Sequence, residues 1–385
     1  MRIKWNEEQR ALLAGFEPWY EALSSVGDDF ASRWQLVRES GLLELPFEPK
    51  WGGRGLDLLS TMYILEGLGY GCRDAGLAFS LVTQLVSVGV PLQQYGSDEL
   101  KAEYLPGICH GDLITAHAIT DPAGGSDVLG MHMTAQRDGT DWMLDGRKAF
   151  ITNGPVASLL VVYAVTDRSA GPLGLTALVV ERDTPGLKMG PELHTMGLSG
   201  APMCDLTFDG CRVPASHALG GVGRGFLVLS HVMAWEVLCS FIVTVGEMQH
   251  RLERCVRYAN ERTAFGRPIG TFQSVANRIV DMRIGVETAR RWLYGAAEAL
   301  IAHPGARGAE TEVAIAKLVT SEANVASALH AIQIFGGSGY LTKTGLEQAL
   351  RDAVGGTIYS GSSEIQRTRI ARLTGLAAEM KAVLS

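Results

Sequence analysis

Apolar residues recur along this chain with two different periods, and the change of period divides it into three stretches. From residue 5 to about residue 110 they lie three or four positions apart, which is the spacing of one helix face. Four residues illustrate this spacing: Leu12, Phe16, Tyr20 and Leu23. Ser97 is followed by two acidic residues, a combination typical of a helix start. We therefore expect an N-terminal helical domain over residues 1–111.

From about Asp112 the pattern changes to short runs rich in apolar and β-branched residues, separated by turn-type clusters such as residues 137–141. The runs begin at Leu113, His132, Trp142, Ser158 and Leu175. Short strands at this spacing predict a central antiparallel β-barrel or sandwich over residues 112–220, with its strands ending near Pro214.

The helical period returns from Gly225. Apolar residues on one helix face are spaced alternately three and four positions apart, a spacing that suits helix-on-helix packing. Its members are Leu238, Phe241, Val245, Met248, Leu252, Cys255 and Ala259. Further long helices are expected after Phe272 and up to Phe335. The pattern predicts a C-terminal four-helix-type domain over residues 221–385, and hence an α+β multidomain fold in the order helical, β, helical.

Composition narrows the possible functions. The 385 residues include 34 basic and 41 acidic ones, a net charge of −7, and no basic run offers a footprint for nucleic-acid phosphates. Hydrophobic residues make up 46% of the chain and charged residues 19%, so we expect a globular protein with apolar surface to spare for a subunit interface.

One stretch is apolar enough to be mistaken for a membrane span. Between Arg224 and Glu247 the only formally charged side chain is Glu236. A carboxylate in the middle of the stretch, with His231 and two serines, would be costly in lipid. We therefore expect a buried helix and no membrane partner.

Several common site types have no sequence support. The chain lacks the glycine patterns of dinucleotide-binding and phosphate-binding loops and the GxSxG of hydrolases. Its nine histidines form no ligand-spaced cluster, so no metal is expected. Six scattered cysteines without a CxxC pair, and a start without an apolar leader core, predict reduced thiols in a cytoplasmic protein.

Four segments, in order, resemble the acyl-CoA dehydrogenase flavoprotein family, and the resemblance covers essentially the whole chain. They are residues 118–127 (AITDPAGGSD), 146–154 (GRKAFITNG), 262–273 (RTAFGRPIGTFQ) and 333–340 (QIFGGSGY) with 351–353 (RDA) and 359–366 (YSGSSEIQ). Each motif is weak by itself, but four at plausible spacing are specific. The resemblance implies an FAD cofactor between the β domain and the C-terminal helices, and a homo-oligomer that in the family is usually a tetramer.

The resemblance also assigns FAD contacts. The flavin needs hydroxyl and backbone donors, which Thr120, Ser126 and Thr152 can supply. Phe150 stands where the family commonly has tryptophan, and Arg262 corresponds to a pyrophosphate contact that often reaches a neighbouring subunit. The other implied contacts are Phe265, Gln273, Gln333, Gly336 and Gly337, with Ser362 and Glu364 on the adenosine side. The two adjacent glycines also suit a helix C-cap, and both roles can hold together.

The catalytic base is not where most of the family keeps it. Ser360 occupies the position of the usual glutamate, and a neutral hydroxyl is a poor base for an α-proton. A smaller branch carries the glutamate on an early helix of the last domain, and alignment without gaps from residues 264–266 places it at Glu236. Burial should raise the pKa of this carboxyl towards useful base strength. We predict that Glu236 is the base and that the backbone N–H of Ser360 binds the thioester oxygen.

The implied reaction is α,β-dehydrogenation of an acyl thioester. Residues 70–80, the pair Trp235-Glu236 and residues 359–362 look most like a subgroup that oxidises prolyl and other aminoacyl groups on carrier proteins in natural-product pathways. A basic residue usually follows the Trp-Glu pair there, whereas this chain has Val237. Two alternatives stay open: a short- or branched-chain acyl-CoA dehydrogenase, and a non-catalytic flavin-binding homologue. The sequence leaves open whether electrons pass to oxygen or to a partner flavoprotein.

Overall fold

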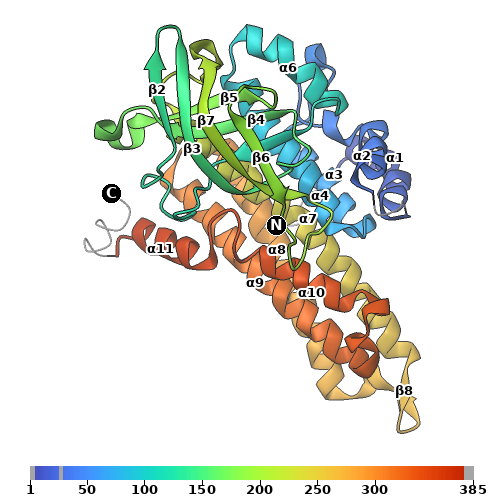
Figure 1. Ribbon diagram of the computed structural model, residues 1–385. Coiled ribbons are helices and arrows are strands. Elements are labelled where there is room, and N and C mark those ends of the chain that lie inside the picture. The colour runs from blue at the N-terminus through green and yellow to red at the C-terminus, as the bar shows by residue number, and fades with distance from the viewer. Residues whose placement is uncertain (1–4, 26–28, 377–385) are drawn as a thin grey trace.

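The structure is a computed structural model and describes residues 5–25 and 29–376. The expectation about the N-terminal leader rests partly on residues 1–4, which lie outside the described residues. Helices at the start of the chain pack beside a curled β sheet, and a long helical bundle extends away from both (Figure 1). The predicted order of helical, β and helical stretches is confirmed.

The first part is helical, as expected. Its long elements are α1 (Glu7–Ser25), α2 (Phe30–Ser40), α3 (Leu58–Gly71), α4 (Ala75–Val82), α5 (Val90–Tyr95) and α6 (Asp98–His110), with short turns η1 (Leu42–Glu44) and η2 (Pro49–Trp51). The Ser97 side chain accepts a hydrogen bond from Leu100 N–H at the start of α6, which confirms the predicted cap. Between α4 and α5 the helix continues as a π-helix, η3 (Thr83–Gly89), and all seven of its residues are buried.

The central sheet is curled and mainly antiparallel, as predicted, and it contains two parallel pairings in addition. Its strands are β1 (Thr115–Ala118), β2 (Thr134–Asp138), β3 (Asp141–Thr152), β4 (Leu159–Val165), β5 (Leu175–Glu181), β6 (Leu187–Glu192) and β7 (Met203–Pro214), with a short turn η4 (Arg168–Gly174) before β5 and η5 (Ala215–His217) after β7. The strand order is β1-β4-β2-β3-β7-β6, with β5 beside β4. β1 and β4 are neighbours in the sheet and run parallel. Along the chain they are connected through the β2–β3 hairpin, which serves as the crossover. The inward-facing side chains form a core of their own.

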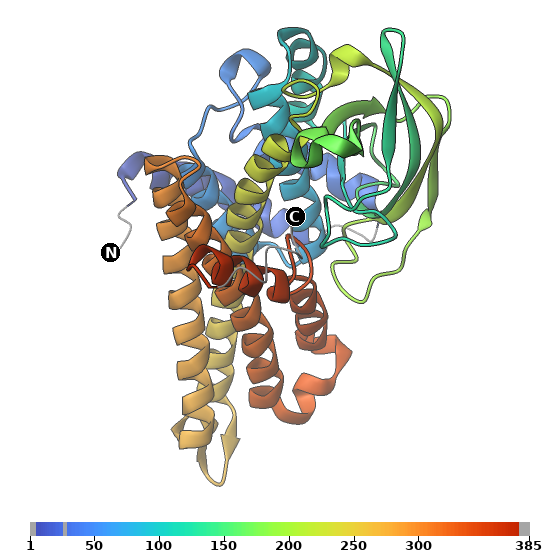
Figure 2. The same ribbon diagram turned by 90° about the vertical axis from the view of Figure 1, so that its left-hand side faces the viewer.

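The last part is an elongated bundle. Its elements are α7 (Gly225–Glu261), the hairpin β8 (Thr263–Ala264) and β9 (Arg267–Pro268), η6 (Ile269–Thr271), α8 (Gln273–Ala302), α9 (Arg307–Phe335), η7 (Gly336–Tyr340), η8 (Thr342–Thr344), α10 (Leu346–Gly355) and α11 (Ser363–Leu373). Every member of the predicted α7 packing face, from Leu238 to Ala259, is buried. In both views the β8–β9 hairpin lies at the end of the bundle remote from the sheet (Figures 1 and 2).

Two glycines let the N-terminal helices approach the bundle closely. An added Cβ at Gly69 on α3 would lie 1.9 Å from the carbonyl oxygen of Val243, and one at Gly246 on α7 would lie 2.1 Å from that of Glu66. The backbones of α3 and α7 therefore touch at this crossing, and a side chain at either position would push them apart.

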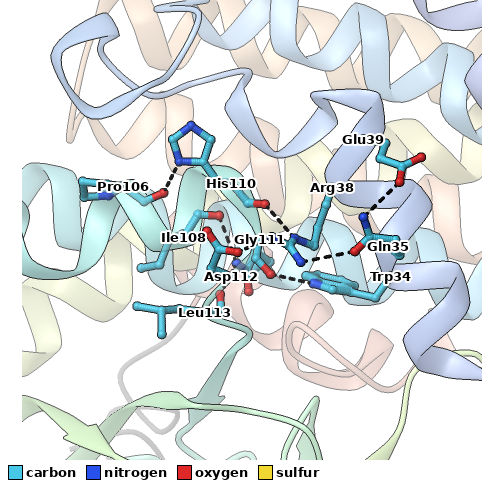
Figure 3. Close-up of polar contacts among 11 residues, drawn as sticks. Trp34, Gln35, Arg38, Glu39, Pro106, Ile108, His110, Gly111, Asp112 and Leu113 are labelled. Carbon is cyan, nitrogen blue, oxygen red and sulfur yellow. Dashed lines mark hydrogen bonds and ion pairs between the residues drawn. The ribbon is translucent and has the colours of Figure 1, made fainter.

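The boundary between the helical part and the sheet is tied by α2 (Figure 3). The indole N–H of Trp34 donates to the carbonyl of Gly111 at 3.0 Å, and Arg38 donates to the carbonyl of His110 at 3.2 Å and pairs with Asp112. Gly111 has a φ of +73°, in the left-handed region, and ends α6. These contacts fix the direction in which the chain enters β1.

Among the described residues, two helical stretches are long and apolar enough to span a membrane by length and composition alone, residues 75–95 and α7. Of the apolar window in each, 89% and 56% respectively is buried inside the fold. The expected burial of residues 224–247 within a packed helix therefore agrees with the structure.

All six cysteines are free thiols and all are buried. Burial raises the pKa of each of them, to about 11 for Cys72 and about 12 for Cys109. Because the thiolate is the reactive form, these side chains act as packing groups.

Candidate active site

Glu236 lies where the three parts of the fold meet. It sits in the fourth turn of α7, and its carboxylate accepts a hydrogen bond on each oxygen. Ser87 Oγ, from η3, donates to Oε2 at 2.8 Å, and Ser360 Oγ, from the turn before α11, donates to Oε1. The structure therefore brings together the two positions at which the sequence analysis weighed a base.

The electrostatics around Glu236 favour a carboxyl that can take up a proton. Burial raises its pKa above the ordinary value, and the hydrogen bonds from Ser360 and Ser87 act in the opposite direction. The net direction is upward, as the sequence analysis expected of a carboxyl in an apolar stretch.

Ser360 stands in an unusual backbone conformation. Its φ is +53°, in the left-handed region that non-glycine residues rarely adopt, and Gly361 follows with φ +81°. The buried side-chain amide of Gln366 donates to the carbonyl of Ser360 at 2.9 Å and to that of Gly361 at 3.4 Å. Within the described chain the Ser360 N–H donates no hydrogen bond, so it is available to a ligand.

Aromatic side chains surround this turn. Tyr359 packs with its ring 4.6 Å from that of Phe79 and 5.4 Å from that of Phe241. On the other side, the hydroxyl of Tyr163 is fully buried without a partner among the described residues. Burial, and next the charge of Glu236, raise the Tyr163 pKa, so this phenol stays neutral near the carboxylate.

A small polar cavity of about 20 Å³ lies behind Tyr359. This volume suits a single water molecule. Its polar lining comes from Ser240, Thr244, Glu247, Ser321, Asn324 and Asp352. Burial raises the pKa of Glu247 to about 7, against the opposing charge of Arg251.

Two residues that contact Glu236 or the turn at Ser360 were not among the predicted site residues. Ser87 lies in the otherwise apolar run of residues 85–92, where nothing in the local pattern marks a functional hydroxyl. Gln366 was inside the quoted segment 359–366, so its position was available, but its clamp on the Ser360 and Gly361 carbonyls depends on the folded turn.

The first group of expected FAD residues gathers at one end of the sheet. Ala149 N–H donates to the Thr120 carbonyl at 2.8 Å, which joins the segment after β1 to the middle of β3. Phe150, next along β3, has φ +59° and an exposed fraction of 63%. Thr152 is half-buried at the end of β3, and Ser126 is exposed in the loop before β2. An exposed ring held in this way, with hydroxyls near it, suits a planar ligand.

A buried ion pair supports this loop. Lys148 Nζ lies 2.7 Å from Asp121 Oδ1 and donates to the carbonyl of Ile119 at 2.8 Å, and both charged side chains are at most 2% exposed. Asp121 also accepts from the N–H groups of His132 and Met133. Burial lowers the pKa of Lys148 to about 8, whereas its bonds to Asp121 act to raise it.

The second group lies at the remote tip of the bundle. Arg262 ends α7 and is exposed, and its guanidinium makes no hydrogen bond or ion pair with a described residue. Phe265, with φ +50°, has an exposed fraction of 96%, and Gln273 is exposed at the start of α8. These side chains are directed away from their own chain.

The glycine pair at the end of α9 belongs to this tip. Gly336 caps α9, with its N–H donating to the Gln333 carbonyl and φ +57°, so the C-cap role is confirmed. A Cβ at Gly336 or Gly337 would meet nothing within 4 Å in this chain. The Gln333 side chain is exposed beside them. Close packing within the described part of the chain therefore does not explain Gly337.

Ser362 and Glu364 lie at the opposite end of the bundle from that tip, at the start of α11. The Ser362 side chain caps this helix by accepting from Ile365 N–H at 3.3 Å, and Glu364 is exposed in the first turn. Within a single chain, the residues at the start of α11 and those at the bundle tip are therefore separated by much of the length of α8. The 30 residues of this helix span roughly 45 Å (Figures 1 and 2). One copy cannot bring both groups to one cofactor.

Comparison with known proteins covers most of the chain. Family models described as "Acyl-CoA dehydrogenase" match as N-terminal domain over residues 10–112, middle domain over 116–211 and C-terminal domain over 223–374. A curated L-prolyl-(peptidyl-carrier protein) dehydrogenase from a Serratia species is 39% identical over 343 residues, which are 89% of this chain and 88% of the relative.

Solved structures agree. The prolyl acyl carrier protein oxidase AnaB superposes with a TM-score of 0.92 at 39% identity, over 97% of this chain and all of its own. PigA, solved with FAD and proline, superposes with a TM-score of 0.92 at 35% identity, over 98% of this chain and all of its own.

Proposed function

Because this chain belongs to the acyl-CoA dehydrogenase family, we propose that it carries out FAD-dependent α,β-dehydrogenation of an aminoacyl thioester tethered to a carrier protein. The observation that carries the proposal is the position of Glu236, a buried carboxylate bonded to the very residue, Ser360, that replaces the usual base. By their names, the Serratia relative and AnaB act on prolyl groups bound to carrier proteins, which supports the choice of substrate class.

In this reaction Glu236 takes the α-proton of the thioester. Burial raises its pKa, so the carboxylate gains the proton affinity that a general base needs near neutral pH. The free N–H of Ser360 donates to the thioester oxygen and stabilises the negative charge that develops there. Bound FAD would supply the acceptor for the hydride that leaves the β-carbon.

The cofactor is held by both groups of residues, supplied by two copies of the chain. Thr120, Phe150 and Thr152 of one copy fit the flavin, because they present hydroxyls and an exposed ring at one edge of the sheet. Arg262 and Phe265 of a second copy fit the diphosphate side, because the guanidinium has no partner among the described residues and the ring, which touches only the edge of Phe272 there, is 96% exposed. This arrangement requires a homo-oligomer.

The remaining parts of the proposal concern the surroundings of the reaction. The electrons leave to a partner flavoprotein or to oxygen, and the substrate arrives on a phosphopantetheine arm. Six buried free thiols support a reducing, cytoplasmic location.

The test is a comparison of substrates on purified holoenzyme. Carrier proteins loaded with prolyl, other aminoacyl or simple acyl groups, and the matching CoA thioesters, are incubated with it, and the arm is analysed by mass spectrometry. We expect loss of two hydrogens per oxidation on an aminoacyl carrier, together with bleaching of the flavin under argon. Turnover of acyl-CoA only would assign the chain to short- or branched-chain acyl-CoA oxidation, and a coloured protein that bleaches with none of them would make it a non-catalytic homologue.

A further inference from the structure

We propose that Ser87 and Ser360 are positioning residues that together fix the carboxylate of Glu236, one hydroxyl on each oxygen. This inference rests on the proposed function, in which Glu236 is the base. It gives position 360 a side-chain role, in addition to the backbone role proposed above.

The geometry is that of a two-point clamp. Ser87 Oγ approaches Oε2 and Ser360 Oγ approaches Oε1, so rotation of the carboxylate about its last bond would break both hydrogen bonds. A carboxylate has about four acceptor sites, so two remain free to take a proton. The clamp therefore orients the carboxylate of Glu236 and leaves two of its acceptor sites free for a proton.

Each hydroxyl is itself held by rigid structure. Ser87 is 1% exposed and lies in the π-helix, a departure from α geometry that is common at functional sites. Ser360 is kept at φ +53° by the buried Gln366 amide, which donates to the carbonyls of two consecutive residues, Ser360 and Gly361. A serine with φ in the left-handed region is strained, and such strain persists where the surrounding structure enforces it.

The clamp also has an electrostatic consequence. Hydrogen bonds to a carboxylate favour the charged form, so each hydroxyl lowers the pKa that burial raises. The other titratable groups that interact with Glu236 in the described chain are the phenols of Tyr163, from β4, and Tyr359. Burial first, and the nearby charges next, raise the pKa of both phenols, so neither carries a charge that could replace the clamp.

The experiment compares pH profiles of kcat/KM for Ser87→Ala, Ser360→Ala and Ser360→Gly on the substrate that the holoenzyme turns over. The base must be ionised, so activity is lost as pH falls through its pKa. Loss of one hydroxyl should move this acid limb up by about one pH unit. Ser360→Gly suits a positive φ and Ser360→Ala does not, so an equal shift in both variants assigns the effect to the hydroxyl.

Ser240→Ala is the matched control. Ser240 is a buried serine on α7, four residues from Glu236, and its hydroxyl has no partner among the described residues. We expect its acid limb to coincide with that of the wild type. A limb that stays in place in both Ser360 variants and in Ser87→Ala, or that moves as far in Ser240→Ala, would overturn the clamp.

A second measurement does not depend on turnover. Infrared titration follows the carbonyl band of the protonated Glu236 carboxyl, identified by its absence in Glu236→Gln. The clamp predicts that this band grows in at higher pH in each clamp variant than in the wild type. If no thioester is turned over but the band shifts, the proposed function fails and the clamp stands. If turnover is normal and neither the band nor the limb moves, the clamp alone fails.

Discussion

In the proposed reaction, a carboxylate on either of two segments would serve the same site, because the fourth turn of α7 and the turn before α11 meet at the hydrogen bond between Glu236 and Ser360. Ser360 and Glu236 lie 124 positions apart in the chain and are joined by a hydrogen bond. The base can therefore change position without any change of fold, provided that the vacated position does not obstruct it. A small hydroxyl residue satisfies that condition and adds a donor.

The first prediction concerns Glu236 itself. Glu236→Gln keeps the size and the hydrogen-bonding capacity of the side chain but removes the proton acceptor, so we expect turnover to fall by about 10²- to 10⁴-fold. The bound FAD, measured by its visible absorbance per chain, should be unchanged. Full activity of this variant would exclude Glu236 as the base.

The second prediction is the sign of the pH dependence. Because burial raises the pKa of Glu236, the wild-type acid limb of kcat/KM should have its midpoint above about 4.3, the ordinary value of a glutamate. Activity is present above that midpoint and is lost as pH falls through it. A rate profile over pH 4.5 to 9, with bound flavin measured at each pH, checks this. A limb at or below the ordinary value would contradict it.

At this scale the sequence could identify Glu236, since one charge in an apolar stretch is visible without a structure. It could not identify Ser87, because a serine within an apolar run is usually a satisfied core hydroxyl. The partner that makes it functional is 149 positions away.

Single elements show where the periodicity of the sequence is informative and where it is not. The packing face of α7 could be predicted, because amphipathic spacing persists over many turns. The π-helix could not, because η3 is buried on all sides and its apolar residues carry no period. β7 alternates buried Cys204, Leu206 and Phe208 with more exposed residues, so its signal was present in the sequence, although the runs singled out there stopped at β5.

The third prediction concerns the ion pair that supports the loop after β1. Lys148→Met leaves the Asp121 carboxylate buried without its cation, and we expect the free energy of unfolding to fall by about 3–5 kcal/mol. Chemical denaturation measures this.

Arg212→Met is the matched control for that variant. Arg212 pairs with Asp138 on the same sheet, but both side chains are at least half exposed. The loss there should stay below about 1 kcal/mol. Equal losses in the two variants would show that burial of the Lys148 pair has no special effect.

On the scale of the whole molecule, the residues expected around FAD occupy two ends of an elongated chain. The sequence could indicate this only through the resemblance, because spacing along a chain does not reveal which groups face outward. At the bundle tip, the exposure of Phe265 and the lack of a described partner for the Arg262 guanidinium are features of the folded molecule.

The fourth prediction follows from sites shared between two copies. Arg262→Ala and Glu236→Gln should each be inactive as pure assemblies. In a random co-assembled mixture, half of the dimers contain one chain of each kind, and one of their two sites receives both intact residues. We therefore expect activity to return to about a quarter of the wild-type value.

Mixing the two purified variants without dissociating their assemblies is the control, and it should restore nothing until the subunits exchange. Failure of co-assembled mixtures to regain any activity, although mixed dimers are present, would mean that each site is built from one chain.

The six buried cysteines make this molecule convenient for site-specific labelling. Their burial and raised pKa values leave little thiolate at neutral pH, so the native chain should react slowly with maleimides. In the cofactor-free protein, where position 265 is 96% exposed, Phe265→Cys would then supply the only fast-reacting thiol of the described chain, at the tip of the bundle. The distance between spin labels at this position in neighbouring copies would then report how the copies are arranged in solution.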